Sequence, residues 1–312
     1  MHRLVHRRRQ RKLFLFFTVL LGGCAVIFCL FLLPRISLRE QKEISQPTPR
    51  TPQQVEKSEL PKEKPITTFK PPEDYTIPVI CYHDFREGGK HAYWAIPPKR
   101  FEAHLQMLTA MGFTFLKMSE AVELMQGRWN KPIPRRPIAI TIDDGFRSAY
   151  TVAYPLLRKY KAKATLFVYT NAIGKFGLSW DQLREMVQSG IIEVASHTVS
   201  HIHPKRLKKL NKDAYRERLA YEFITSKRIL EEKLGITVNG LAYVGGVADA
   251  VTVEMAQKAG YRWAVRITPS PMTVQTNPYL IPRYGVSKQT TTMVLKAWLS
   301  QPRYGVACSS LP

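Results

Sequence analysis

Two short segments of the sequence combine carboxylate and imidazole side chains in a pattern that suits metal-dependent hydrolysis. Asp143 and Asp144 are adjacent, and His197 and His201 lie four residues apart. Two imidazoles and one carboxylate, with coordination positions left open, are ligands typical of hydrolytic metal sites. Neighbouring residues of a strand point to opposite faces, so one aspartate can bind a metal while the other acts as a base. The alternatives are surface histidines in a basic loop, and an aspartate that caps a helix starting near Ser148.

The sequence from Ile77 onward alternates apolar runs with amphipathic stretches. The predicted strands are 77–82, 137–142, 164–169, 191–195, 240–243, 261–267 and 280–286, and the predicted helices are 98–111, 147–160, 179–190, 213–234, 251–259 and 291–299. This alternation predicts an α/β fold in which crossover helices cover a parallel sheet, either open or closed into a barrel. Chemistry in such folds collects at the carboxyl ends of the strands. Polar or glycine-rich stretches follow four of these strands: Tyr82-His83-Asp84, Asp143-Asp144-Gly145, Ser196-His197 and Tyr243-Val244-Gly245-Gly246.

Two of these stretches resemble family motifs. Thr141-Ile142-Asp143-Asp144-Gly145-Phe146 resembles the T-F-D-D-G motif of the polysaccharide deacetylases, the NodB-homology carbohydrate esterases, and Ser196-His197-Thr198-Val199-Ser200-His201 resembles their H-[ST]-x-x-H motif. The resemblance covers roughly 77–300. It implies a distorted (β/α)7 barrel that uses a divalent metal to remove N-acetyl groups from polymeric amino sugars. It also implies that Asp143 is the base and that Asp144, His197 and His201 bind the metal. Such a donor set suits Zn²⁺ first, with Co, Ni or Mn as alternatives.

The third motif of the family departs from its usual form. Where the family often has R-x-P-Y or A-Y-P-Y-G, this chain has Ala242-Tyr243-Val244-Gly245-Gly246, without the proline, the second aromatic residue or a leading arginine. The catalytic contribution of this motif is a backbone N–H to the oxyanion, and a backbone group tolerates a changed side chain. We therefore assign that donor to Gly245. Arg283, at the end of the last predicted strand, is a candidate replacement for the missing arginine.

The general acid is also displaced, because the family usually takes it from a late histidine and this chain has none after His203. A circularly permuted branch, resembling the poly-N-acetylglucosamine deacetylases, carries this histidine early in a V-x-x-Y-H stretch. Val79-Ile80-Cys81-Tyr82-His83 is similar, so we assign the acid to His83; the alternative is a half-buried structural histidine. Cys81 lies on the same strand face, inside the predicted barrel, and is not expected to reach Cys308. His203 is either a substitute ligand or exposed.

The N-terminal part of the chain predicts a membrane anchor. Residues 1–12 are a basic cytoplasmic segment, and 13–33 is an uncharged run about 30 Å long as a helix, enough to span a bilayer. The stronger positive flank should stay inside. Residues 34–76 are a Pro-rich linker, and 77–312 form the catalytic domain. This predicts a single-pass protein of the cell membrane with an extracytoplasmic catalytic domain. A cleaved signal peptide, or lipoprotein processing at Leu21-Gly22-Gly23-Cys24, are the alternatives.

The net charge of +23 limits the classes of binding partner that the sequence predicts. A basic domain favours an anionic wall, a membrane surface or nucleic acid. The sequence has no RNA-binding signature, no zinc-finger spacing and no basic region leading into heptads, so no nucleic-acid partner is predicted. The predicted partners are an N-acetylated glycan polymer and, through the N-terminal helix, the membrane. A non-catalytic glycan-binding module, and an esterase or amidase acting on another acyl group, remain as alternative functions.

Overall fold

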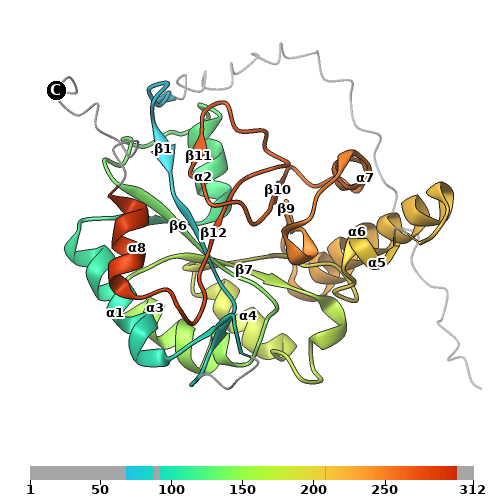
Figure 1. The fold of residues 1–312 in the computed structure, drawn as a ribbon, viewed down its shortest axis with the longest axis horizontal. Coiled ribbons are helices and arrows are strands. Elements are labelled where there is room, and N and C mark those ends of the chain that lie inside the picture. The colour runs from blue at the N-terminus through green and yellow to red at the C-terminus, as the bar shows by residue number, and fades with distance from the viewer. Residues whose placement is uncertain (1–67, 88–91, 208, 301–312) are drawn as a thin grey trace, which may run out of the picture. The chain divides into compact units, whose positions relative to one another are not determined.

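The computed structural model describes residues 68–87, 92–207 and 209–300 (Figure 1). The predicted anchor at 13–33, most of the predicted linker and Cys308 lie outside these ranges, so their predictions stay open. Within the described ranges, no helix combines the length and apolar character needed to cross a membrane.

A parallel sheet forms the centre of the fold, as the strand–helix alternation predicts. Its main path runs in the order β10-β9-β8-β7-β6-β2-β12, with parallel neighbours throughout. The strands are β2 (Val79–Tyr82), β6 (Pro137–Ile142), β7 (Ala164–Val168), β8 (Ile192–Ser196), β9 (Gly240–Ala242), β10 (Trp263–Val265) and β12 (Tyr284–Gly285). An eighth strand that the sequence pattern missed, β5 (Thr114–Leu116), pairs with the first half of β6.

The segment before β12 joins the two ends of this path. Val265 of β10 forms a parallel bridge with Ile281, and the N–H of Ile281 donates to the carbonyl of Ala264 at 3.0 Å. Three residues later the same segment, as β12, pairs with Ile80 and Cys81 of β2. The single strand predicted at 280–286 is therefore split, because the segment changes neighbours partway along. The sheet curls back toward its start, which fits a (β/α) barrel.

Helices cover the outside of the sheet (Figure 1). They are α1 (Pro98–Ala110), α2 (Met118–Met125), α3 (Tyr154–Lys159), α4 (Trp180–Gln188), α5 (Pro204–Leu207), α6 (Lys212–Leu234), α7 (Ala250–Lys258) and α8 (Thr292–Leu299). The predicted capping box begins α4: Ser179 Oγ accepts the Gln182 N–H at 3.1 Å, and the Gln182 side chain accepts the Ser179 N–H at 2.9 Å. Gly235, in the left-handed region with φ of 65°, ends α6.

One predicted helix, 147–160, is divided into a π-helical turn, η1 (Ala149–Ala153), followed by α3. Pro155 lies in the first turn of α3 and has no N–H to donate four residues back, so the regular hydrogen-bond ladder is interrupted there. The remaining short elements are η2 (Thr170–Ala172), η3 (Val244–Gly246), the antiparallel pair β1 (Thr76–Ile77) and β11 (Met272–Thr273), and the parallel pair β3 (Asp84–Phe85) and β4 (Ala95–Ile96).

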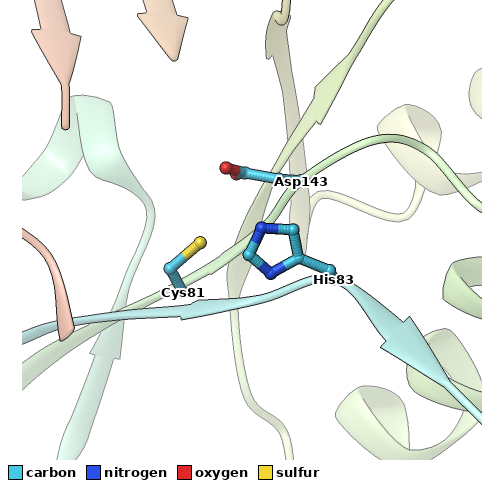
Figure 2. Close-up of side chains that lie close together, drawn as sticks. All are labelled: Cys81, His83 and Asp143. Atoms are coloured by element: carbon cyan, nitrogen blue, oxygen red, sulfur yellow. The ribbon is translucent and has the colours of Figure 1, made fainter. Parts of the chain in front are cut away.

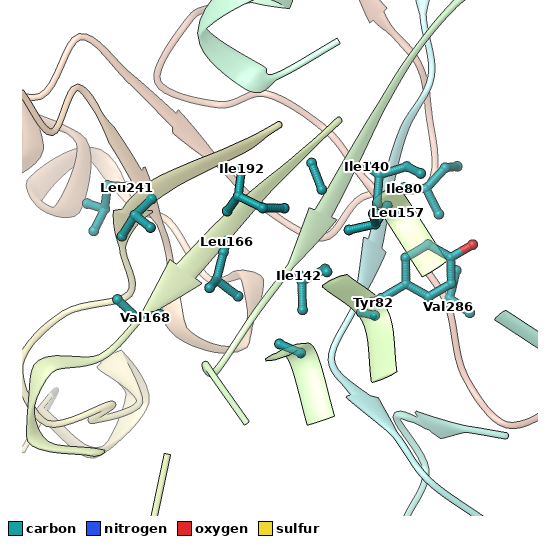
Figure 3. Close-up of a cluster of buried hydrophobic side chains, with 14 of the residues drawn as sticks. Ile80, Tyr82, Ile140, Ile142, Leu157, Leu166, Val168, Ile192, Leu241 and Val286 are labelled. Atoms are coloured by element: carbon teal, nitrogen blue, oxygen red, sulfur yellow. The ribbon is translucent and has the colours of Figure 1, made fainter. Parts of the chain in front are cut away.

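Alternate residues of each strand serve two apolar clusters. Ile80, Tyr82, Ile140 and Ile142 belong to the cluster between the sheet and the helices (Figure 3). Val79 and Ala139, from the same two strands, belong to the other cluster, together with Phe167, Ala195, Ala242, Trp263, Val265 and Ile281. Because side chains alternate with a period of two, the inner face of β2 continues to Cys81 and His83, and that of β6 to Thr141 and Asp143. The candidate catalytic residues His83 and Asp143 therefore lie at one end of the barrel interior, just beyond β2 and β6.

Candidate active site

Asp144, His197 and His201 come together at the carboxyl ends of β6 and β8. Asp144 Oδ1 lies 3.4 Å from His197 Nε2 and 3.1 Å from His201 Nε2. One ligand atom from each residue falls within 4.8 Å of the others. Burial raises the pKa of Asp144, but the hydrogen bonds of His197 and His201, with the charges of His197 and His83, outweigh this effect and hold the pKa below its ordinary value. The predicted ligand set therefore forms a compact group.

The two aspartate side chains point in different directions, but not because of strand alternation, as the sequence analysis expected. β6 ends at Ile142, so neither carboxylate belongs to the strand, and Asp144 has a left-handed φ of 71°. A turn, rather than strand alternation, directs Asp144 toward the histidines. Gly145 continues this turn with φ of 69°, and a Cβ there would come within 2.8 Å of Val168 Cγ1. The glycine of the motif is thus required by both backbone conformation and space.

The chemistry of the donor set fits a divalent transition metal. His197 is almost fully buried, and its Nδ1 lies 2.8 Å from the carbonyl oxygen of Ala242. A carbonyl only accepts, so Nδ1 carries a hydrogen, and Nε2 is the ring nitrogen that faces Asp144 and is left for a metal. His201 is more open, with 37% of its side chain exposed, and its ring lies against Tyr169 with centroids 5.0 Å apart. Two imidazole nitrogens and a carboxylate oxygen suit Zn²⁺, Co, Ni or Mn.

Asp143 occupies a different environment from its neighbour. Arg283 donates from Nη1 to Asp143 Oδ1 and from Nη2 to Oδ2, both at 2.7 Å, and also from Nη1 to Thr141 Oγ1 at 3.0 Å. The Asp143 and Arg283 side chains are 3% and 0% exposed. Burial raises the pKa of Asp143, but the charge and hydrogen bonds of Arg283 hold it below its ordinary value. Arg283 therefore holds and orients Asp143, which is consistent with its candidacy as the replacement for the missing motif arginine.

Cys81 of β2 and His83, which directly follows β2, face Asp143 (Figure 2). Trp94 stacks on the His83 ring with centroids 4.9 Å apart. Among the described residues, the buried Nδ1 of His83 has no hydrogen-bond partner, which does not favour a purely structural histidine. Burial lowers the pKa of His83, against the raising effect of Asp143 and Asp144. Cys81, His83 and Asp143 also lie close enough to share an ion, but Arg283 already neutralises Asp143, so we assign the metal to the Asp144 group.

The glycines of the altered third motif lie in the turn η3 that follows β9. Gly245 has φ of 65°, and a Cβ on it would lie 2.4 Å from His203 Nε2. Gly246 has φ of 67° and donates its N–H to the carbonyl of Tyr243 at 2.9 Å. His203 covers Gly245, accepts the Lys205 N–H through Nδ1 at 3.2 Å and is not part of the Asp144 group. The oxyanion role of Gly245 stays a prediction.

Sequence reasoning missed Glu222, a buried residue of α6 that contacts the loop carrying both metal-site histidines. Its carboxylate accepts the backbone N–H groups of Val199 and Ser200 at 2.9 and 2.8 Å. A signal was present in the sequence: Glu222 and Ser226 fall within the stripe of buried positions that also includes Leu219, Phe223 and Leu230. Polar residues on the buried face of a helix need partners, and these partners lie in the functional loop.

Comparisons with known proteins agree with the fold and show the family. The family model for polysaccharide deacetylases matches residues 130–264. The chain is 30% identical over 257 residues to YxkH of Bacillus subtilis, whose name places it among the polysaccharide deacetylases; the match covers 80% of this chain and 86% of that protein. This chain therefore belongs to the polysaccharide deacetylase family and is an enzyme of that kind, as its motifs indicated.

Two further matches bear on the resemblance to poly-N-acetylglucosamine deacetylases. The poly-beta-1,6-N-acetyl-D-glucosamine N-deacetylase of Staphylococcus epidermidis is 28% identical over 217 residues, which cover 66% of this chain and 72% of that protein. The structure of IcaB from Ammonifex degensii superimposes with a TM-score of 0.63 at 26% identity, covering 73% of this chain and 98% of that one.

Proposed function

We propose that this chain is a metal-dependent hydrolase that removes N-acetyl groups from an extracytoplasmic amino-sugar polymer of the poly-N-acetylglucosamine type. The observation that carries the proposal is that two adjacent carboxylates have different partners. Asp144 faces His197 and His201, whereas Asp143 is held by Arg283 and faces His83. One site thus offers a ligand group and an ionised base side by side. The named activity of the Staphylococcus epidermidis relative supports the choice of glycan.

Asp144, His197 and His201 would hold the metal. A divalent ion bound there supplies Lewis-acid chemistry, polarising an acetamide carbonyl and making water more acidic. Asp143 accepts the proton of the attacking water, and its lowered pKa keeps it ionised for this task. The Gly245 N–H donates to the developing oxyanion. The proposed base therefore follows β6, and the proposed oxyanion donor follows β9.

His83 donates the proton that the departing amine needs. Burial lowers its pKa, which makes the imidazolium form a strong acid, and the nearby negative charge of Asp143 favours its formation. Trp94 fixes the ring by stacking and remains 40% exposed at the surface, beside the 47% exposed Tyr93. On the other side of the site, Tyr169 contacts both His201 and the 59% exposed Phe176. These rings offer apolar faces on which sugar rings can stack.

The test is acetate release by the full-length chain from peptidoglycan, poly-N-acetylglucosamine and chitin-like oligomers, with and without chelator. Release from poly-N-acetylglucosamine that stops on chelation and returns with Zn²⁺ supports the proposal. Asp144→Asn should lose metal and activity together, whereas Asp143→Asn should keep metal and lose turnover by roughly 10²–10⁴-fold. Release from none of the three glycans, with activity only on an activated acyl ester, favours an esterase instead.

The location of the enzyme is part of the same proposal. The uncharged run at 13–33 and the preceding basic cluster support a single-pass anchor that leaves the catalytic domain outside the cell. An extracytoplasmic site would meet a polymeric glycan directly. Membrane fractionation followed by external protease treatment tests this location, and a soluble secreted form beginning after residue 33 would contradict it.

A further inference from the structure

The loop that carries both metal-site histidines has an unfavourable backbone conformation. Thr198 and His201 have φ of 75° and 56°. These values lie in the left-handed region, which residues other than glycine rarely adopt. His201, in this conformation, has its Nε2 3.1 Å from Asp144 Oδ1. Such a loop needs contacts from the surrounding structure to keep its shape.

The long helix α6 supplies these contacts through Glu222. Its Oε2 accepts the N–H groups of Val199 and Ser200 at 2.9 and 2.8 Å, and its Oε1 accepts the Ser200 hydroxyl at 2.6 Å. The Glu222 side chain is only 1% exposed, and Arg218, one turn earlier, donates to Oε1 at 2.6 Å. A buried carboxylate thus binds two consecutive backbone N–H groups between the two histidines.

A second residue of α6 contacts the start of the same loop. Ser226 Oγ lies 2.7 Å from Ser196 Oγ, which accepts the N–H of Thr198 at 3.1 Å. Glu222 and Ser226 are four residues apart and therefore lie on one face of the helix. The backbone N–H groups of Val199 and Ser200 donate to Glu222 itself. The N–H of Thr198 donates to Ser196, which Ser226 contacts.

We propose that Glu222 is a positioning residue that sets metal affinity by holding the 197–201 loop, an inference that rests on the proposed function of the Asp144 group. The carboxylate offers two acceptor oxygens to three donors of the loop. A glutamine at this position has the same shape, but an NH₂ group replaces one of the two oxygens. An NH₂ group cannot accept a hydrogen bond, so the donors that face it lose their acceptor. The loop would then relax toward more favourable φ values, and His201 would lose its alignment with Asp144.

Glu222→Gln in the full-length protein tests this role. We expect the dissociation constant for Zn²⁺, measured by competition with a chelator, to rise by about 10–100-fold, the usual effect of removing an outer-shell partner. At saturating Zn²⁺, kcat and the KM for the glycan should return close to parent values. The absorption spectrum of the Co²⁺-loaded protein should also change, because it reports ligand geometry directly.

Glu231→Gln is the matched control. Glu231 lies on the same helix, accepts a backbone N–H from Val238 at 2.9 Å and pairs with Lys227 at 2.6 Å, but it does not contact the loop. This variant should lose thermal stability without losing metal affinity. Should Glu222→Gln fail to fold, Glu222→Asp, which keeps the charge but shortens the side chain, is measured in the same way and should also bind Zn²⁺ more weakly.

The outcomes separate the two proposals. If the parent protein and Glu231→Gln bind Zn²⁺ and the folded Glu222 variant binds it equally tightly, with an unchanged Co²⁺ spectrum, Glu222 is only structural and the inference is wrong. If the parent protein itself binds no metal, the proposed function fails instead. A weaker Zn²⁺ affinity in the Glu222 variant alone supports the positioning role.

Discussion

Replacing Arg283 by methionine would show how the base is kept ionised. Arg283 donates to both oxygens of Asp143 at 2.7 Å, and both side chains are buried. Removing one partner of a buried ion pair costs about 3–5 kcal/mol, because the other charge is left without compensation. One pKa unit corresponds to about 1.36 kcal/mol. Asp143 can relieve the cost by taking up a proton, so its pKa should rise by roughly two to four units.

The assay is the pH dependence of kcat/KM for acetate release, measured together with bound metal. The base must be ionised, so the acidic limb of the profile should move up by about two to four pH units in Arg283→Met, and activity should recover at alkaline pH. Bound metal should stay at the parent level, because the hydrogen bonds of Arg283 go to Asp143 and Thr141 rather than to the ligands.

Arg216→Met provides the control for the loss of a guanidinium. Arg216 pairs with Glu254 at 2.7 Å between α6 and α7, and its removal should leave the profile unchanged. A folded Arg283→Met variant with the acidic limb of the parent protein would refute the reasoning, since Asp143 would then be ionised without its partner.

His201→Ala should remove bound metal and activity, whereas His203→Ala should retain metal, as measured by metal analysis; the reverse result would overturn the ligand assignment. His83→Ala should keep metal and lose turnover on the glycan amide, yet hydrolyse an activated acetate ester nearly as well as the parent, because that leaving group needs little acid. Burial lowers the pKa of His104 from 6.5 to about 4, so the unfolded chain takes up the proton first as the pH falls. The fold should therefore lose up to about 3 kcal/mol between pH 6.5 and 4, and acid unfolding of His104→Gln should lack this loss. The full-length protein should fractionate with membranes and resist alkaline carbonate, as the run at 13–33 predicts; full extraction would count against an anchor.

The sequence by itself determined the features that depend on near neighbours in the chain. The alternation of strands and helices indicated the parallel α/β class, and the period of two along β2 and β6 indicated the inner face of each strand, which ends just before His83 and Asp143. The Ser179–Gln182 capping box formed as predicted because its partners are three residues apart. The adjacent aspartates and the histidine pair identified the family, because the spacing of these motifs is itself local.

Only the tertiary structure decided the contacts between distant segments. Arg283 meets Asp143 across 140 residues of sequence, and the segment around Ile281 leaves β10 to pair with β2. Glu222 became a partner of the 197–201 loop only through the rotation of α6 against β8. Such contacts depend on strand register, helix rotation and turns such as the left-handed Asp144. These are set by the packing of the whole barrel, since local patterns specify which face is buried but not which distant residue it meets.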